Sequence, residues 1–164
     1  TLSGGALMEG GSFAWINEKT AVIGCGIRVN RDGAQQIAEV LKRQGVELIA
    51  IDLVGYDIHI DGSFLMVDKD LALIDPSGLP YSFIEQLREL NVRTVEISPD
   101  DDKWIVNSLA IAPGELIMPR GGSNRTLDKL ASHGVRWTVL PYDKKKLNGG
   151  GIHCSTTPLI SNTV

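Results

Sequence analysis

The fold is decided by a stretch that reads AQQIAEVLKRQGV, residues 34–46. Its apolar side chains recur at helical spacing, which places Ile37, Val40 and Leu41 on one face of a predicted helix over residues 34–44. This helix should end at Gly45, because glycine enters the left-handed conformation without steric cost. The β-branched run of residues 46–51 is typical of a strand. A helix that leads directly into a strand indicates an α/β fold.

The same layout recurs twice further along the chain. Helices are predicted over residues 81–90 and 126–133, and they should end at Asn91 and Gly134. The three helix ends are spaced by about 45 residues, which is the period of a repeat architecture. Strands are expected after the second and third helices at residues 92–97 and 135–140.

Two short apolar runs joined by turn residues precede each helix, which is the pattern of a β-hairpin. These runs are residues 12–16 with 20–24, 63–67 with 71–74, and 105–111 with 115–118. The unit is therefore strand, strand, helix, strand, and each unit needs neighbours to bury its apolar face. We expect repeats at residues 9–52, 59–98 and 104–141, with a partial unit at 149–164.

Composition narrows the functional classes. The chain has 164 residues, of which 43% are hydrophobic and 22% charged, and 16 basic against 20 acidic side chains give a net charge of −4. That balance offers no basic field for nucleic acid or an anionic membrane surface. The apolar runs are far shorter than the roughly 20 residues of a membrane-spanning helix. These features predict a soluble, cytoplasmic protein whose two cysteines are reduced thiols.

Side chains suited to catalysis fall in the segments that lead into equivalent units, namely Glu9, the pair His59 and Asp61, and Cys154. Equivalent segments of a ring of repeats would meet at one central axis. If residues 58–61 are extended, His59 and Asp61 lie on the same face. A carboxylate beside an imidazole favours the imidazolium, which in turn would hold a nearby thiol as thiolate.

Three consecutive glycines, residues 149–151, allow the backbone before Cys154 to approach a ligand closely. Cys25 lies in an apolar run and is expected in the core. In an extended segment, His153 would point away from Cys154 and is the weaker candidate for a base. The Cys and His spacings match no metal-ligand pattern, and no phosphate loop or dinucleotide fingerprint is present, so no metal and no cofactor is expected.

Taken together, the motifs resemble those of the guanidino-group-modifying enzymes of the pentein superfamily. The motifs are residues 9–11, residues 24–28, His59-Ile60-Asp61 with Phe64, and the glycine run that ends in His153-Cys154. The superfamily includes arginine deiminase, agmatine deiminase, dimethylargininase and the amidinotransferases. The resemblance implies an α/β propeller of five ββαβ units around a central active site, of which this chain holds about three.

The resemblance also implies roles for particular residues. Cys154 aligns with the nucleophile, His59 with the general acid and base, and Asp61 with the carboxylate that binds the guanidinium. Glu9 aligns with the second acidic residue, which lies beside the histidine. The remaining candidates are substrate contacts, namely Arg28, which would bind a substrate carboxylate, and Gly150 and Gly151.

Two departures from the family pattern concern substrate contacts. Ser12 stands where the deiminases usually have Asp, and Gly26-Ile27-Arg28-Val29 replaces the more usual Ser-Glu-Arg-Thr. An asparagine-bearing strand of the family is matched by Asn107, to which no catalytic role is assigned.

Three functions remain open from the sequence. The first is a cysteine-dependent hydrolase that acts on free arginine or a close derivative through a covalent thiouronium. The second is an amidinotransferase, in which an amine rather than water resolves that intermediate. The third is a non-catalytic pentein-fold binding protein. We also expect an N-terminal companion segment or subunit that completes the propeller, and a homo-oligomer remains open.

Overall fold

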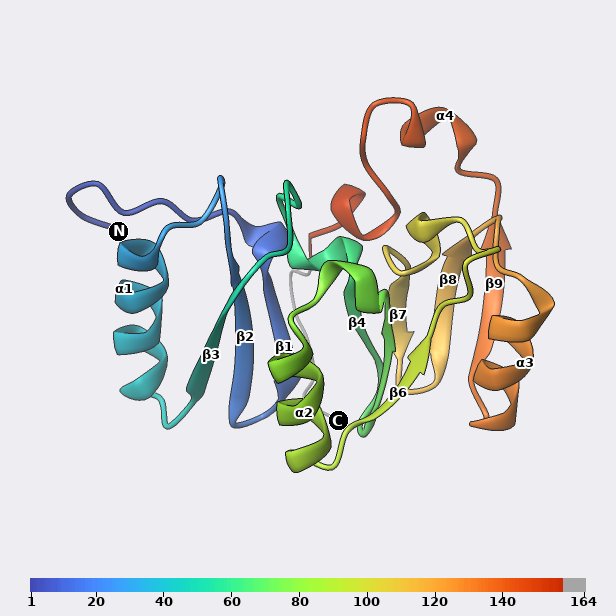
Figure 1. Ribbon diagram of the computed structural model, residues 1–164, viewed down its shortest axis with the longest axis horizontal. Coiled ribbons are helices and arrows are strands. Elements are labelled where there is room, and N and C mark those ends of the chain that lie inside the picture. Colours follow the sequence, from blue (N-terminus) through green and yellow to red (C-terminus); the bar gives the residue numbers. More distant parts are fainter. Residues whose placement is uncertain (158–164) are drawn as a thin grey trace.

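The protein forms three separate three-stranded sheets that stand side by side in chain order (Figure 1). The structure, a computed structural model, describes residues 1–157, without the side chains of Lys145 and Lys146. The strands are β1 (Phe13–Asn17), β2 (Thr20–Cys25) and β3 (Glu47–Asp52); β4 (Phe64–Asp68), β5 (Leu71–Ile74) and β6 (Arg93–Glu96); β7 (Leu109–Ala112), β8 (Glu115–Pro119) and β9 (Arg136–Leu140).

All three sheets have the same topology. The first two strands form an antiparallel hairpin, and a helix then returns the chain so that the third strand pairs in parallel with the second. Each hairpin carries a register shift near the end of its first strand, and this shared irregularity marks the sheets as copies of one unit. The predicted fold class, an α/β arrangement of ββαβ repeats, is confirmed.

The repeat helices are α1 (Arg31–Lys42), α2 (Tyr81–Glu89) and α3 (Asn124–Ser132). α1 begins earlier than predicted because the side chain of Asn30 caps it by accepting a hydrogen bond from the Gly33 N–H. All three helices are followed by the left-handed residues expected from the sequence, Gly45, Asn91 and Gly134, with φ of 75°, 59° and 81°.

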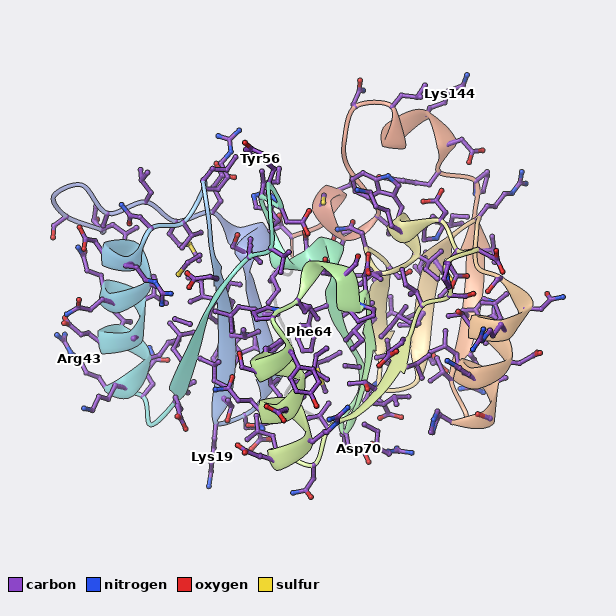
Figure 2. The ribbon with its side chains drawn as sticks, viewed as in Figure 1. Lys19, Arg43, Tyr56, Phe64, Asp70 and Lys144 are labelled. Atoms are coloured by element: carbon purple, nitrogen blue, oxygen red, sulfur yellow. The ribbon has the colours of Figure 1, made fainter. Side chains whose placement is uncertain are left out.

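The core lies mainly between the repeats. α2 packs its Phe83 and Leu87 against side chains of both the first and the second sheet, in a cluster that includes Val22 and Phe64. α3 packs in the same way between the second and third sheets, where Leu130 lies against Leu73 and Met118, among others. Figure 2 shows Phe64 in the interior between the repeats. Each repeat thus depends on its neighbour for burial.

Two of the predicted strands differ in part from the structure. The segment 105–111 forms a strand only from Leu109 onwards, because Lys103–Ile105 is a short 3-10 helix capped by the Asp102 side chain. The start of the partial fourth unit, near Cys154, is the 3-10 helix His153–Ser155 rather than a strand. Residues 158–164 of that unit lie outside the described residues. A short helix, α4 (Asp143–Lys146), precedes it.

None of the helices within residues 1–157 is long and apolar enough to cross a membrane.

A carboxylate ties the second repeat to the third. Asp101 accepts hydrogen bonds from the backbone N–H groups of Ser98 and Ser123 and from the Thr126 hydroxyl. Burial alone would raise the pKa of this carboxyl, but the hydrogen bonds outweigh burial and lower its pKa. The ionised form is therefore the one that the folded protein stabilises.

We expect Asp101→Asn to lower the free energy of unfolding at pH 7 by about 1–3 kcal/mol, the usual range for hydrogen bonds to a charged group, because the partly buried acceptor would lose its charge. A depressed pKa contributes stability above about pH 4, the ordinary pKa of Asp, and this contribution disappears as the pH falls through the folded value. The difference between wild type and variant in urea unfolding should therefore shrink below pH 4. Asp100→Asn, an exposed neighbour, is the control; an equal loss in both variants would contradict the prediction.

Candidate active site

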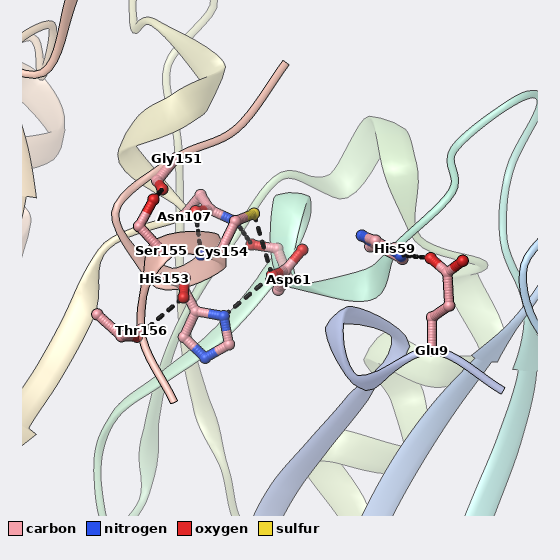
Figure 3. Close-up of polar contacts among 9 residues, drawn as sticks. All are labelled: Glu9, His59, Asp61, Asn107, Gly151, His153, Cys154, Ser155 and Thr156. Atoms are coloured by element: carbon pink, nitrogen blue, oxygen red, sulfur yellow. Dashed lines mark hydrogen bonds and ion pairs between the residues drawn. The ribbon is translucent and has the colours of Figure 1, made fainter. Parts of the chain in front are cut away.

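The predicted site residues gather at one end of the sheets, where the parallel strands have their carboxyl ends. Short 3-10 helices position them: Gly10–Ser12 follows Glu9, Ile60–Gly62 follows His59 and contains Asp61, and His153–Ser155 contains Cys154. The Ser12 hydroxyl donates a hydrogen bond to the Ile58 carbonyl at 3.1 Å, which joins the first turn to the second. Figure 3 shows two neighbouring groups of side chains, Glu9 with His59 and Asp61 with Asn107, His153 and Cys154.

Glu9 and His59 form the first contact of the site. His59 Nε2 lies 2.7 Å from Glu9 Oε2, and the carboxylate can only accept, so this ring nitrogen donates. Arg28 Nη1 lies 3.5 Å from the other oxygen of Glu9. A Cβ at Gly11 would lie 2.6 Å from His59 Nδ1, so the ring occupies space that only glycine leaves free. The first glycine motif therefore positions the histidine.

Asp61 forms the second contact, with different partners. Its carboxylate is buried, and Oδ2 lies 2.9 Å from His153 Nδ1 and 3.5 Å from Cys154 Sγ. Residues 60–62 form a turn rather than an extended strand, so the expectation that His59 and Asp61 share a face as neighbours in a strand is wrong. The expectation that His153 points away from Cys154 is wrong for the same reason, since both side chains reach one oxygen of Asp61.

The environment of Cys154 opposes ionisation of its thiol. Although the residue as a whole is exposed, burial of the thiol is the largest influence and raises its pKa. A hydrogen bond from the Gly151 backbone lowers the pKa, the negative charge of Asp61 raises it, and a hydrogen bond from Asn107 lowers it; the net direction is upward. The expected thiolate held by an imidazolium is therefore not the resting form that these groups favour.

A cavity of about 350 Å³ opens between these groups. Its lining includes His59, Asp61 and Cys154, three of the predicted site residues. Two further carboxylates, Asp57 and Asp75, line it together with one amine, Lys103. Carboxylates thus outnumber the amine, and such a cavity attracts cations. Tyr56, which also lines it, projects at this end of the molecule (Figure 2).

Four predicted site residues lie outside the cavity lining. Glu9 contacts both Arg28 and His59. Gly150 and Gly151 precede the Cys154 turn, and the Gly151 carbonyl accepts a hydrogen bond from the Ser155 hydroxyl. A Cβ at Gly151 would lie 2.1 Å from Asn107 Oδ1, whereas one at Gly150 would meet only Cys154 Cβ, at 3.9 Å.

Cys25 is buried in the core, away from these groups. Among residues 1–157, no cluster of three or more His, Cys, Asp or Glu side chains is placed to hold a metal ion.

Sequence reasoning missed Asn107 as a site residue. Its side chain is fully buried, and Nδ2 donates to Cys154 Sγ at 3.2 Å and to the Asp61 carbonyl at 3.1 Å. The sequence feature that could have identified Asn107 is its position as a polar residue in an apolar segment, just before strand β7.

The family follows from a direct match. Residues 3–105, more than half of the chain, match the model of the arginine deiminase family. The chain belongs to this family and thereby to the pentein superfamily.

Solved structures show the same fold. A mutant DDAH from Pseudomonas aeruginosa, complexed with citrulline, has a TM-score of 0.77 and 19% identity over 93% of this chain and 56% of that one. The N-terminal domain of ArgZ, an arginine dihydrolase from the ornithine-ammonia cycle in cyanobacteria, has a TM-score of 0.75 and 20% identity over 88% of this chain and 53% of that one.

An amidinotransferase of saxitoxin biosynthesis, SxtG from Microseira wollei, has a TM-score of 0.76 and 13% identity over 88% of this chain and 45% of that one. The chain therefore spans about half the length of the structures it matches.

We expect Gly11→Ala to displace the His59 ring, because the added methyl group would occupy the space of the ring nitrogen. The imidazole resonances of His59 in long-range ¹H–¹⁵N spectra should shift, and their contact with Glu9 should be lost. Gly10→Ala is the matched control, since nothing lies within 4 Å of a Cβ there. Unchanged His59 resonances in folded Gly11→Ala would contradict this account of the glycine motif.

Proposed function

We propose that the chain is the catalytic part of a cysteine-dependent hydrolase that acts on the guanidino group of free arginine or a close derivative. The observation that carries this proposal is that Cys154, His59 and Asp61 line one acidic cavity. A thiol, an imidazole and a buried carboxylate are the nucleophile, proton carrier and cation partner that such a reaction needs. The family membership and the dihydrolase and amidinotransferase among the proteins of the same fold support the same class of chemistry.

In the proposed reaction, the Cys154 thiolate attacks the guanidinium carbon and forms a C–S bond. His59 gives a proton to a terminal nitrogen, which leaves as ammonia when its C–N bond breaks, and the product is a thiouronium on Cys154. His59 then removes a proton from water, whose oxygen adds to the same carbon. As the C–S bond breaks, its electron pair returns to sulfur and the added hydroxyl loses its proton to solvent, which releases the neutral ureido product and restores the thiolate.

Asp61 links substrate binding to ionisation of the nucleophile in this proposal. Its negative charge is among the influences that raise the pKa of the Cys154 thiol. A guanidinium bound to Asp61 as a hydrogen-bonded ion pair would neutralise that charge locally. The thiol would then ionise more readily when the substrate is present than when the cavity is empty.

Glu9 and Arg28 have supporting roles in the proposal. The carboxylate of Glu9 holds the His59 ring by its Nε2 and stabilises the imidazolium that forms when His59 takes a proton. Arg28 would bind a substrate carboxylate, for which the permanently charged, planar guanidinium is well suited. Half of its side chain is exposed, so it can leave the 3.5 Å contact with Glu9 to do so.

The rate of ammonia release from arginine should fall about 10⁴-fold or more in Cys154→Ala, which lacks the nucleophile. In His59→Ala it should fall about 10²- to 10⁴-fold through loss of proton transfer. Cys25→Ala removes the other thiol and should change the rate less than about twofold. Citrulline, ornithine and ammonia are measured with the purified full protein. Formation of none of them by wild type would refute the hydrolase, whereas transfer of the amidino group to an added amine would identify an amidinotransferase.

We further propose that the chain is the C-terminal part of one pentein catalytic domain, completed by an N-terminal companion segment or subunit. The support is that matched structures are about half covered, and that the third sheet exposes apolar side chains, Ile111 of β7 and Val139 of β9. Native mass spectrometry of the active species should give a mass well above the 17.7 kDa of this chain. A fully active 17.7 kDa monomer would overturn the proposal.

A further inference from the structure

The Cys154 turn is attached to the third repeat through the buried residue Asn107. Asn107 lies directly after the 3-10 helix Lys103–Ile105 and its cap residue, and its side chain is fully buried. Its backbone carbonyl accepts a hydrogen bond from the His153 N–H at 3.1 Å. Its side-chain Oδ1 accepts a hydrogen bond from the Cys154 N–H at 3.3 Å. The backbone N–H groups of His153 and Cys154 therefore both donate hydrogen bonds to Asn107.

The same amide group also reaches the sulfur. Asn107 Nδ2 donates to Cys154 Sγ at 3.2 Å and to the Asp61 carbonyl at 3.1 Å. The orientation of the amide is fixed by its partners, because a backbone carbonyl can only accept and a backbone N–H can only donate. The NH₂ group must therefore face Asp61 and the sulfur, and the oxygen must face the Cys154 N–H.

We propose that Asn107 is a catalytic residue of the site, whose amide donates a hydrogen bond that stabilises the Cys154 thiolate while its carbonyl oxygen fixes the turn bearing the nucleophile. This inference rests on the proposed role of Cys154 as nucleophile. A sulfur acceptor gains most from the donor when it is charged, so the contact strengthens on ionisation. The hydrogen bond offsets part of the effect of Asp61, whose negative charge raises the thiol pKa.

Gly151 lies against the Asn107 amide and leaves the space that this amide occupies. A methyl group at this position would lie 2.1 Å from Asn107 Oδ1 and 2.5 Å from Cγ. Any residue other than glycine would push the amide away from the sulfur. The last glycine of the run is therefore explained by contact with Asn107, whose amide takes the space beside the nucleophile.

The test is the pH dependence of Cys154 alkylation by iodoacetamide in the full protein, followed by mass spectrometry of the labelled peptide. In Asn107→Ala, the rate at pH 7 should fall about tenfold, because the thiolate fraction falls tenfold when the apparent pKa rises by one unit. Ser108→Ala is the matched control: Ser108 is equally buried and donates to the Ile105 carbonyl at 2.6 Å, but it is not a partner of Cys154. Its profile should equal that of wild type. Cys25, which is buried, serves as the internal unreactive thiol.

Gly151→Ala provides a second route to the same result, because it displaces the amide without removing a polar group. It should shift the alkylation profile in the same direction as Asn107→Ala, even if Asn107→Ala fails to fold. An unshifted profile in a folded Asn107→Ala or Gly151→Ala protein would overturn the inference. Alkylation requires no turnover of arginine, so a shifted profile in a protein that hydrolyses no guanidino compound would refute the proposed function but still show that Asn107 stabilises the Cys154 thiolate.

Discussion

The whole arrangement depends on how each helix is buried. A three-stranded sheet with one helix cannot cover both of its faces, so α2 and α3 each pack between their own sheet and the preceding one. Phe83 and Leu87 of α2 do this between the first two sheets, and Leu130 of α3 between the last two. Because every junction is built in the same way, the carboxyl ends of all the parallel strand pairs face the same end of the molecule. The site can therefore be assembled from turns that are far apart in the sequence.

The apolar junctions place the turns, and polar contacts then join them. Ser12 reaches Ile58 across the first junction, and Asn107 reaches Asp61 across the second. These bonds are made by side chains that are almost completely buried, where a donor without an acceptor would cost about 1–3 kcal/mol. The repeats consequently fix both the positions of the site residues and their orientation.

The sequence predicted the elements that depend on the local residue pattern. It did not predict the turns and contacts that depend on residues far away in the sequence. Helical spacing and the left-handed positions Gly45, Asn91 and Gly134 predicted the repeats, since each of these signals lies within one unit. Residues 105–108 have an apolar pattern that also suits a strand, but the cap at Asp102 starts a turn there instead. Asn107 was matched to a strand of the family but was given no role, because the partners that define its role are 46 and 47 residues away.

His59 and Asp61 were identified as a pair, but the turn at residues 60–62 gives them separate partners. This separation has a chemical consequence in the proposed reaction. A single charged pair would tie the imidazole to the carboxylate that must bind the guanidinium. Glu9 instead holds His59 at 2.7 Å, and Asp61 contacts His153 at 2.9 Å, so in the proposed reaction a guanidinium at Asp61 would leave His59 in place as the proton carrier. Burial is the largest influence that raises the pKa of the Cys154 thiol, and the negative charge of Asp61 adds to it; in the proposed reaction a cation bound to Asp61 would offset this second contribution. Binding of a guanidinium at Asp61 would then both select the substrate and favour ionisation of the Cys154 thiol.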